Sequence, residues 1–167
     1  MIQDPIRFFA PGIPRPGGSK KGFYSAKLKR VLIVDASKNV APWRQTLIHF
    51  AGMAYQGPPL DGPLRLDVVF TMPRPKAHYR IRARLPQELR SEAPMFHTSA
   101  PDTTKLLRAV EDALTGIVWR DDRQIAVQYV TKFYGDRPGA NITVGTLDDD
   151  AYQMLKGMAN EPGQEDR

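Results

Sequence analysis

Residues 101–125 read PDTTKLLRAVEDALTGIVWRDDRQI, and this stretch decides the fold because it holds the clearest helix signal in the chain. We predict a helix from Asp102 to Thr115. Asp102 follows a proline and is a typical helix start, with its carboxylate capping free N–H groups, and Gly116 is a suitable stop. Between these ends, apolar residues recur at helical spacing and predict one buried stripe. The stripe consists of Leu106, Leu107, Val110, Ala113 and Leu114.

Downstream of this helix, two apolar segments predict strands over residues 125–134 and 140–144. The connection between them, residues 135–139, reads GDRPG and has the glycine and proline content of a turn. We therefore predict that the two strands form an antiparallel hairpin. Residues 147–167 form an acidic C-terminal tail with six acids and two bases, which is either mobile or a short helix.

Upstream, the pattern predicts one more helix and three strands. The helix covers residues 40–55, and its apolar spacing places Trp43, Leu47, Phe50 and Ala54 in the core. The strands cover residues 6–9, 31–34 and 64–70. Together these segments predict an α+β fold, in which residues 1–146 form a single domain with one mixed β-sheet and two main helices packed on it.

The basic charge of the chain lies before the acidic tail. The whole chain has a net charge of +6, but residues 1–146 hold 22 bases against 12 acids. Residues 11–30, expected to form a loop or hairpin arm, hold six bases and no acid, and residues 74–101 form a long basic connection. This excess favours a polyanionic partner such as nucleic acid, although charge alone fits a basic solvated surface equally well.

Several classes of protein are excluded or disfavoured by composition. The chain has no cysteine, which excludes disulfides and thiolate metal sites. No apolar run approaches the roughly 20 residues that cross a bilayer, and the N-terminus lacks the plan of a signal peptide, so we expect a cytoplasmic protein without a membrane segment. The chain also lacks a Walker loop, a GxGxxG loop after a strand and a GxSxG motif.

The acidic residues form the candidate site. Asp102 opens the predicted helix, while Asp121 and Asp122 lie in the turn before the next strand. Carboxylates that converge from a helix and a loop form an oxygen site for Mg²⁺ or Mn²⁺, and Lys105 or Arg108 would bind a phosphate beside it. The alternative is that the aspartates are a helix cap and turn formers and that the cations are solvated. Residue spacing leaves both interpretations open.

Residues 101–116 and 119–125 also resemble the RusA family of Holliday junction resolvases, the crossover junction endodeoxyribonucleases. The family pattern is approximately PDxDxLxKxxxDALxG, followed by a DDxQV block. Three further segments are similar to the family, so that the resemblance covers most of residues 6–146. They are Phe8–Pro16 (FFAPGIPRP), Gly62–Tyr79 (GPLRLDVVFTMPRPKAHY) and Tyr134–Gly139 (YGDRPG).

The resemblance implies a homodimeric α+β nuclease, often of phage or prophage origin, that acts in DNA recombination and repair. It implies Mg²⁺-dependent cutting of branched DNA by paired, symmetric nicks. Asp102 and Asp122 match the family's first and last catalytic aspartates, and Asp121 lies beside the latter as a further metal-ligand candidate. Arg108 stands at the position of the family's functional lysine, which keeps the charge but changes its shape. We expect Lys105 and Arg108 to contact the scissile phosphate.

A DNA-binding surface is expected on the basic arm and on the basic connection. The arm contributes its cations between residues 15 and 30, and the connection contributes residues 74–90. Both would contact the DNA backbone. The candidates are Arg15, Lys20, Lys21, Arg74, Lys76, His78, Arg80 and Arg82.

One departure from the family pattern bears on activity. Thr104 stands where the family has its second helix aspartate, and a neutral hydroxyl is a poor ligand for Mg²⁺. Glu111 lies on the same helix face but roughly 10 Å along the axis. The metal site is therefore expected to be weaker, to recruit Asp121 or Asp112, or to be inactive, which would leave a protein that binds branched DNA. A third possibility is an RNA- or DNA-binding module without chemistry.

Overall fold

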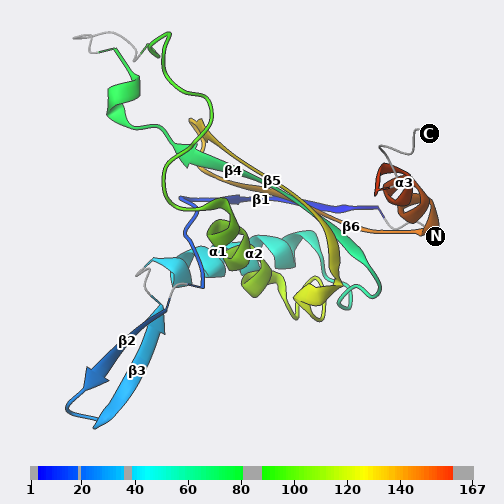
Figure 1. Ribbon diagram of the computed structural model, residues 1–167, viewed down its shortest axis with the longest axis horizontal. Coiled ribbons are helices and arrows are strands. Elements are labelled where there is room, and N and C mark those ends of the chain that lie inside the picture. Colours follow the sequence, from blue (N-terminus) through cyan, green and yellow to red (C-terminus); the bar gives the residue numbers. More distant parts are fainter. Residues whose placement is uncertain (1–3, 19, 36–38, 81–87, 160–167) are drawn as a thin grey trace, which may run out of the picture.

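The computed structural model describes residues 4–18, 20–35, 39–80 and 88–159. A mixed four-stranded sheet forms its centre, in the order β1-β6-β4-β5. The strands are β1 (Ile6–Pro11), β4 (Leu64–Pro73), β5 (Ile125–Gly135) and β6 (Gly139–Thr146). Two helices, α1 (Val40–Ala54) and α2 (Thr103–Leu114), cover one face of this sheet (Figure 1). The predicted α+β fold with a mixed sheet and two main helices is confirmed.

The core lies between this sheet face and the two helices. Alternate residues of β4 are buried from Leu64 to Met72, as a strand with one covered face requires. All five residues of the predicted α2 stripe are buried as well. The expected core face of α1 was partly wrong, because Phe50 is only partly buried and Ala54 is exposed. The buried residues of α1 are Val40, Trp43, Leu47 and Ala51.

The predicted antiparallel hairpin of the last two strands is wrong. β5 and β6 do not pair with each other; both pair with β4, β5 in parallel and β6 antiparallel. Two strand spacings of about 4.8 Å separate them, and the four Cα steps from Gly135 to Gly139 reach up to about 14 Å, so the short connection can cross the end of β4. Both glycines are needed for this crossing: a Cβ at Gly135 would lie 2.6 Å from the Thr71 side chain, and one at Gly139 would lie 2.5 Å from the Ala10 carbonyl.

The parallel pair β4–β5 is joined through α2. Parallel neighbours require a long crossover connection, usually with a helix, and residues 74–124 provide it. This connection also contains the short 3₁₀ helices η1 (Lys76–His78) and η2 (Asp122–Gln124). The strand order therefore places α2 directly against β5, and that packing builds the candidate site.

The segment expected as a loop or hairpin arm is a hairpin. Strand β2 (Lys20–Ser25) pairs antiparallel with β3 (Arg30–Asp35), and the two form a separate two-stranded sheet. The predicted strand 31–34 thus belongs to this arm and not to the main sheet. Figure 1 shows the arm projecting from the body on the side of the helices.

The acidic tail begins with a helix, which was one of its two expected states. Helix α3 (Asp149–Ala159) follows β6 and lies at the far end of the sheet from the arm (Figure 1). The chain approaches it through a backbone hydrogen bond of 2.9 Å from Leu147 N to Pro63 O. Within the described residues, none of the helices combines the length and the apolar character that a membrane crossing needs.

Candidate active site

A surface pocket of about 330 Å³ lies at the N-terminal end of α2. Its walls are Gly17 and Gly18, which precede the arm, together with helix residues and Asp102. Gly17 N donates a 2.8 Å hydrogen bond to Lys105 O, and a Cβ at Gly17 would lie 3.1 Å from the Ala109 backbone. A larger residue would push the arm away from α2. The lining residues are Gly17, Gly18, Asp102, Thr104, Lys105 and Arg108.

Asp102 occupies the N-cap position of α2, but its carboxylate does not cap the helix. The side chain makes no capping hydrogen bond. It lies 3.0 Å from Lys105 Nζ, and 63% of the Asp102 side chain is exposed. The interpretation of this aspartate as a helix cap was therefore wrong for its side chain. The carboxylate is available to a cation in the pocket.

Lys132 on β5 supports the segment that carries Asp102, and sequence reasoning missed it. Its Nζ donates hydrogen bonds to Ser99 O at 2.8 Å and to Pro101 O at 2.6 Å. Burial lowers the pKa of Lys132, and the nearby Asp102 charge opposes that shift. Lys132 lies two residues after Val130, so both side chains point to the covered side of the strand. A lysine at such a position was the signal in the sequence that could have identified it.

Asp122 lies near Glu111, which belongs to the third turn of α2. Burial raises the pKa of Glu111, and the negative charge of Asp122 raises it further, while a 2.5 Å hydrogen bond from Gln128 Nε2 to Glu111 Oε1 opposes the shift. Asp102 and Glu111 are nine residues apart, or about 13 Å along the helix axis. The sequence left open which helix end the aspartate pair approaches, and the structure has Asp122 near Glu111, in the last turn of α2.

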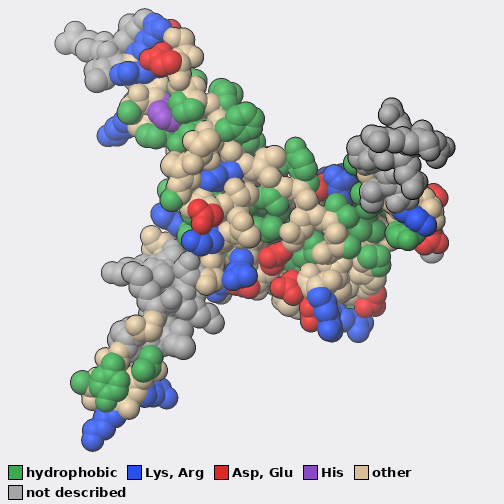
Figure 2. Space-filling view, viewed as in Figure 1, with side chains coloured by type: hydrophobic (Ala, Val, Ile, Leu, Met, Phe, Trp, Pro, Cys, Tyr) green, Lys and Arg blue, Asp and Glu red, His purple; other side chains and the backbone are tan. Residues whose placement is uncertain are grey.

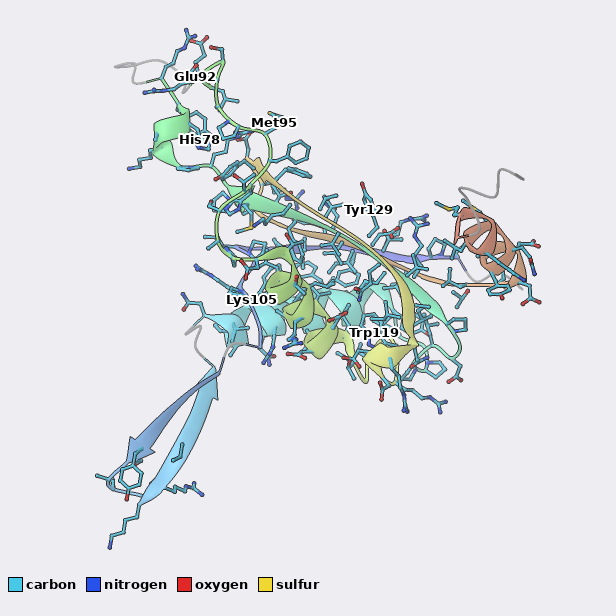
Figure 3. All side chains as sticks on the ribbon, in the orientation of Figure 1. His78, Glu92, Met95, Lys105, Trp119 and Tyr129 are labelled. Carbon is cyan, nitrogen blue, oxygen red and sulfur yellow. The ribbon has the colours of Figure 1, made fainter. Side chains whose placement is uncertain are left out.

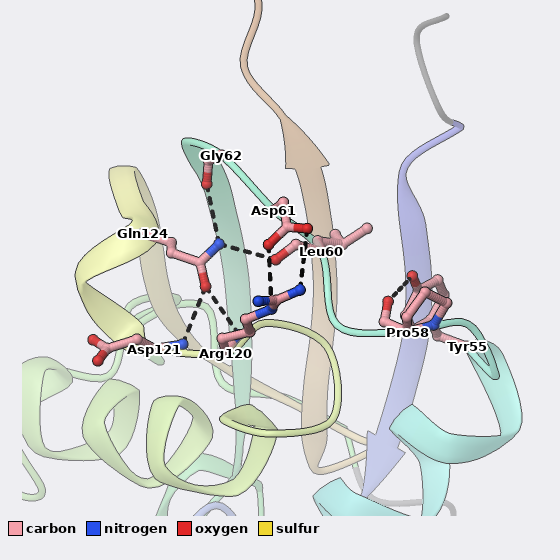
Figure 4. A network of polar contacts seen from close by, with 8 residues as sticks. All are labelled: Tyr55, Pro58, Leu60, Asp61, Gly62, Arg120, Asp121 and Gln124. Carbon is pink, nitrogen blue, oxygen red and sulfur yellow. Dashed lines mark hydrogen bonds and ion pairs between the residues drawn. The ribbon is translucent and has the colours of Figure 1, made fainter.

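Asp121 has the role of a turn former. Its Oδ1 accepts a 3.0 Å hydrogen bond from Arg123 N, which makes it the N-cap of η2. Gln124 completes this capping box, since its Oε1 accepts hydrogen bonds from the backbone N–H groups of Arg120 and Asp121 at 2.9 and 3.1 Å. The Gln124 amide also donates to Leu60 O at 2.9 Å, which ties the turn to the segment before β4 (Figure 4).

Acidic and basic side chains share the surface of α2. Figure 2 shows acidic and basic side chains side by side on this surface, and Figure 3 shows Lys105 on the side of α2 that faces the arm. Thr104 and Arg108 line the same pocket as Asp102. Asp112, by contrast, is bound at 2.5 Å by Arg44 of α1 and so joins the two helices.

Several predicted DNA-binding residues stabilise the protein itself. The Arg74 guanidinium donates to Pro94 O at 2.9 Å and lies 5.7 Å from the centre of the Tyr134 ring. His78 packs edge-on against the same ring at 4.8 Å. Arg80 lies 3.8 Å from Glu88, whereas Lys76 is exposed. Figure 3 shows His78, with Glu92 and Met95, on a projection beyond the end of β4.

The other predicted DNA-binding residues lie near the arm or outside the described part of the chain. Arg15 lines a different pocket, of about 280 Å³, together with Trp43. Lys20 and Lys21 belong to β2 by their backbone. Arg82 lies outside the described residues.

The donor set fits Mg²⁺ by its chemistry. Among the described residues, no three His, Asp or Glu side chains gather closely enough to form a preformed cluster. Mg²⁺ rarely needs one, because it keeps several waters and is commonly bound through one or two carboxylates and the phosphates of a substrate. Asp102 and Asp122 both offer exposed carboxylates of this kind.

Comparisons with known proteins agree with this arrangement. Residues 14–145 match the family described as endodeoxyribonuclease RusA. The chain is also 26% identical to the uncharacterized protein YqaN of Bacillus subtilis (strain 168) over 141 residues, which are 84% of this chain and 96% of that protein. The matched region contains β4, β5, all of β6 but its last residue, the pocket at α2 and the turn of Asp121 and Asp122. This chain therefore belongs to the RusA family of endodeoxyribonucleases.

Proposed function

We propose that the protein is a Mg²⁺-dependent endonuclease that resolves Holliday junctions or other branched DNA by paired symmetric nicks. The observation that carries this proposal is the Asp102 carboxylate. It stands at a helix N-terminus without capping it, in a pocket that also holds Lys105 and Arg108. A helix cap alone would not leave its carboxylate exposed beside two cations.

Asp102 and Asp122 would share the ion through metal-bound waters and the substrate phosphate, because they lie towards opposite ends of α2, with Asp121 as a further ligand candidate. The ion would polarise the phosphate and activate a water, and Mn²⁺ could serve in place of Mg²⁺. Lys105 and Arg108 bind the scissile phosphate and stabilise the charge that develops on it. Arg108 presents a planar fork that holds two phosphate oxygens at once.

A homodimer suits this reaction. Two subunits related by a two-fold axis present two equal sites, and a four-way junction has two opposed strands of equal geometry.

The basic residues of 1–146 favour a DNA partner, and residues 147–167 form an acidic appendage to that nuclease domain. The location of its DNA substrate would make the enzyme cytoplasmic.

A second candidate function is a binding protein with weak or no nuclease activity. The observation that favours it is Thr104, which puts a hydroxyl into the pocket where the family pattern has a carboxylate. The two aspartates expected to be recruited in its place have other partners: Asp112 binds Arg44, and Asp121 caps η2. The two candidates share the fold and the DNA surface and differ in metal chemistry.

Cleavage of a synthetic four-way junction tests both candidates. We expect paired nicks in Mg²⁺ or Mn²⁺, and we expect Asp122→Asn to abolish cutting while junction binding is retained. Tight junction binding without cutting in either metal would support the second candidate instead. Equal affinity for junction and duplex would contradict both. Affinity should fall steeply with salt, because phosphate contacts release counterions.

A further inference from the structure

The β2–β3 arm ends in an apolar tip. Within the described chain, β2 and β3 pair only with each other, and a two-stranded hairpin of this kind is marginally stable by itself in water. Tyr24 and Val31 are directly paired across the two strands and are 65% and 63% exposed. Leu28, in the turn between the strands, is 52% exposed. Three large apolar side chains thus lie together in solvent at the end of the arm.

These side chains have the geometry of a contact surface. Direct cross-strand partners point to the same face of a ribbon, so Tyr24 and Val31 share one face. Val31 packs over Gly22 on that face, since a Cβ at Gly22 would lie 3.5 Å from Val31 Cγ1. Gly22 adds no bulk of its own beside the Tyr24–Val31 pair.

Charge indicates which partner the tip meets. Residues 11–34 hold six Lys or Arg residues and no acid, and the cations next to the tip, Lys27, Lys29 and Arg30, are all exposed. An apolar tip surrounded by positive charge fits a polyanion with stacked, apolar rings inside it better than it fits a second basic copy of this chain. DNA meets both conditions, and its major groove admits a two-stranded ribbon.

We propose that the arm enters the DNA and that Tyr24 and Leu28 insert against its bases, unstacking them locally. This inference rests on the proposed DNA substrate but not on cleavage. Apolar side chains that enter a base step open it, and aromatic rings stack on the exposed bases regardless of sequence. Lys27, Lys29 and Arg30 bind the flanking phosphates.

The base of the arm borders the candidate site. Gly17 and Gly18 line the Asp102 pocket, so the arm begins at the place where the scissile phosphate would bind. Six residues of extended strand reach about 20 Å, and one DNA strand carries a phosphate every 3.4 Å or so. The tip therefore lies about 20 Å of strand away from the pocket, a distance that corresponds to about six nucleotides along a DNA helix axis.

The test uses DNA binding without metal, so that no cleavage occurs. Four-way junctions with 2-aminopurine at successive positions along one arm report unstacking as a rise in fluorescence. We expect this rise with the wild type at one or two neighbouring positions, and its loss with Tyr24→Ala and Leu28→Ala. Met53→Ala, which removes an equally exposed apolar side chain from α1, is the matched control and should behave as wild type.

The salt dependence of affinity separates apolar from ionic contacts. Tyr24→Ala should raise the Kd about 5- to 140-fold with an unchanged slope of log affinity against log salt, because stacking contacts release no counterions. Lys27→Ala should lower that slope by about 0.9 instead.

Three results would overturn the inference. Unchanged Kd and fluorescence in Tyr24→Ala and Leu28→Ala, with wild type binding the junction, would contradict the tip contact and leave the proposed function intact. A wild type that binds no junction at low salt would contradict the proposed function itself. Loss of dimer in both variants on size-exclusion chromatography with light scattering, without a change in DNA binding, would assign the tip to a second copy of the chain.

Discussion

Removal of the Lys132 amine should lower the rate of cleavage far more than it lowers the stability of the fold. Lys132→Met keeps most of the side-chain volume but deletes the two hydrogen bonds to Ser99 O and Pro101 O, which fix the segment before Asp102. A charged hydrogen bond contributes about 1.5–3 kcal/mol, but both carbonyls lie near solvent and regain water, so we expect a total loss of about 2 kcal/mol in unfolding free energy. The fold should survive this change.

The effect on cleavage should be much larger than the effect on stability. A misplacement of about 1 Å at a reacting group costs about 100-fold, so kcat/KM on a four-way junction should fall by about that factor. The Mg²⁺ concentration for half-maximal rate should rise, because Asp102 is no longer held in place. Lys132→Arg, which keeps a charged donor, should recover part of the loss.

The assay compares junction cleavage, metal titration and denaturant unfolding for three variants. Lys156→Met on α3 removes an exposed lysine far from the pocket and is the matched charge control. If Lys132→Met cut junctions at the wild-type rate, Lys132 would not position Asp102. If its cleavage rate and its stability fell in proportion, with an unchanged metal requirement, Lys132 would have a purely structural role and would not position Asp102.

Three further variants address separate features of the structure. Asp102→Asn should abolish cleavage yet change the free energy of unfolding by less than about 0.5 kcal/mol, because the carboxylate does not cap the helix. A loss of about 1–2 kcal/mol in urea-induced unfolding would restore the cap interpretation. Burial lowers the pKa of His97, and the charge of Lys132 adds to the shift, so the unfolded chain takes up a proton first as pH falls below 6.5 and stability falls with it. His97→Phe should therefore reduce the fall in Tm between about pH 6.5 and 5. An unchanged slope of Tm against pH would contradict this. Gly17→Ala should cost about 1–3 kcal/mol and weaken cleavage, because its Cβ meets the Ala109 backbone; normal melts and normal cutting would show that the arm base tolerates displacement.

Local sequence determined the helix that carries the site. The α2 stripe, its start at Asp102 and its end before Gly116 all follow from neighbours within a few residues, which is the range over which helical hydrogen bonds and side-chain spacing act. The similarity of residues 101–125 to the RusA family gave Asp102 and Asp122 as site residues for the same reason, since the motif is local. Composition indicated a basic loop or hairpin arm over residues 11–30, but it did not show that residues 31–34 belong to that arm.

Strand order and site geometry depended on tertiary structure. The connection 135–139 suits a tight hairpin and a crossing over β4 equally well, and only the pairing of β4 with both neighbours decides between them. That decision places β5 against α2, and with it Lys132 under Asp102 and Gln128 beside Glu111. Whether an aspartate at a helix start caps that helix or faces a pocket is likewise set by what packs against it. Pairing and packing join residues far apart in the chain, and their free energy depends on surfaces that exist only once the sheet has formed.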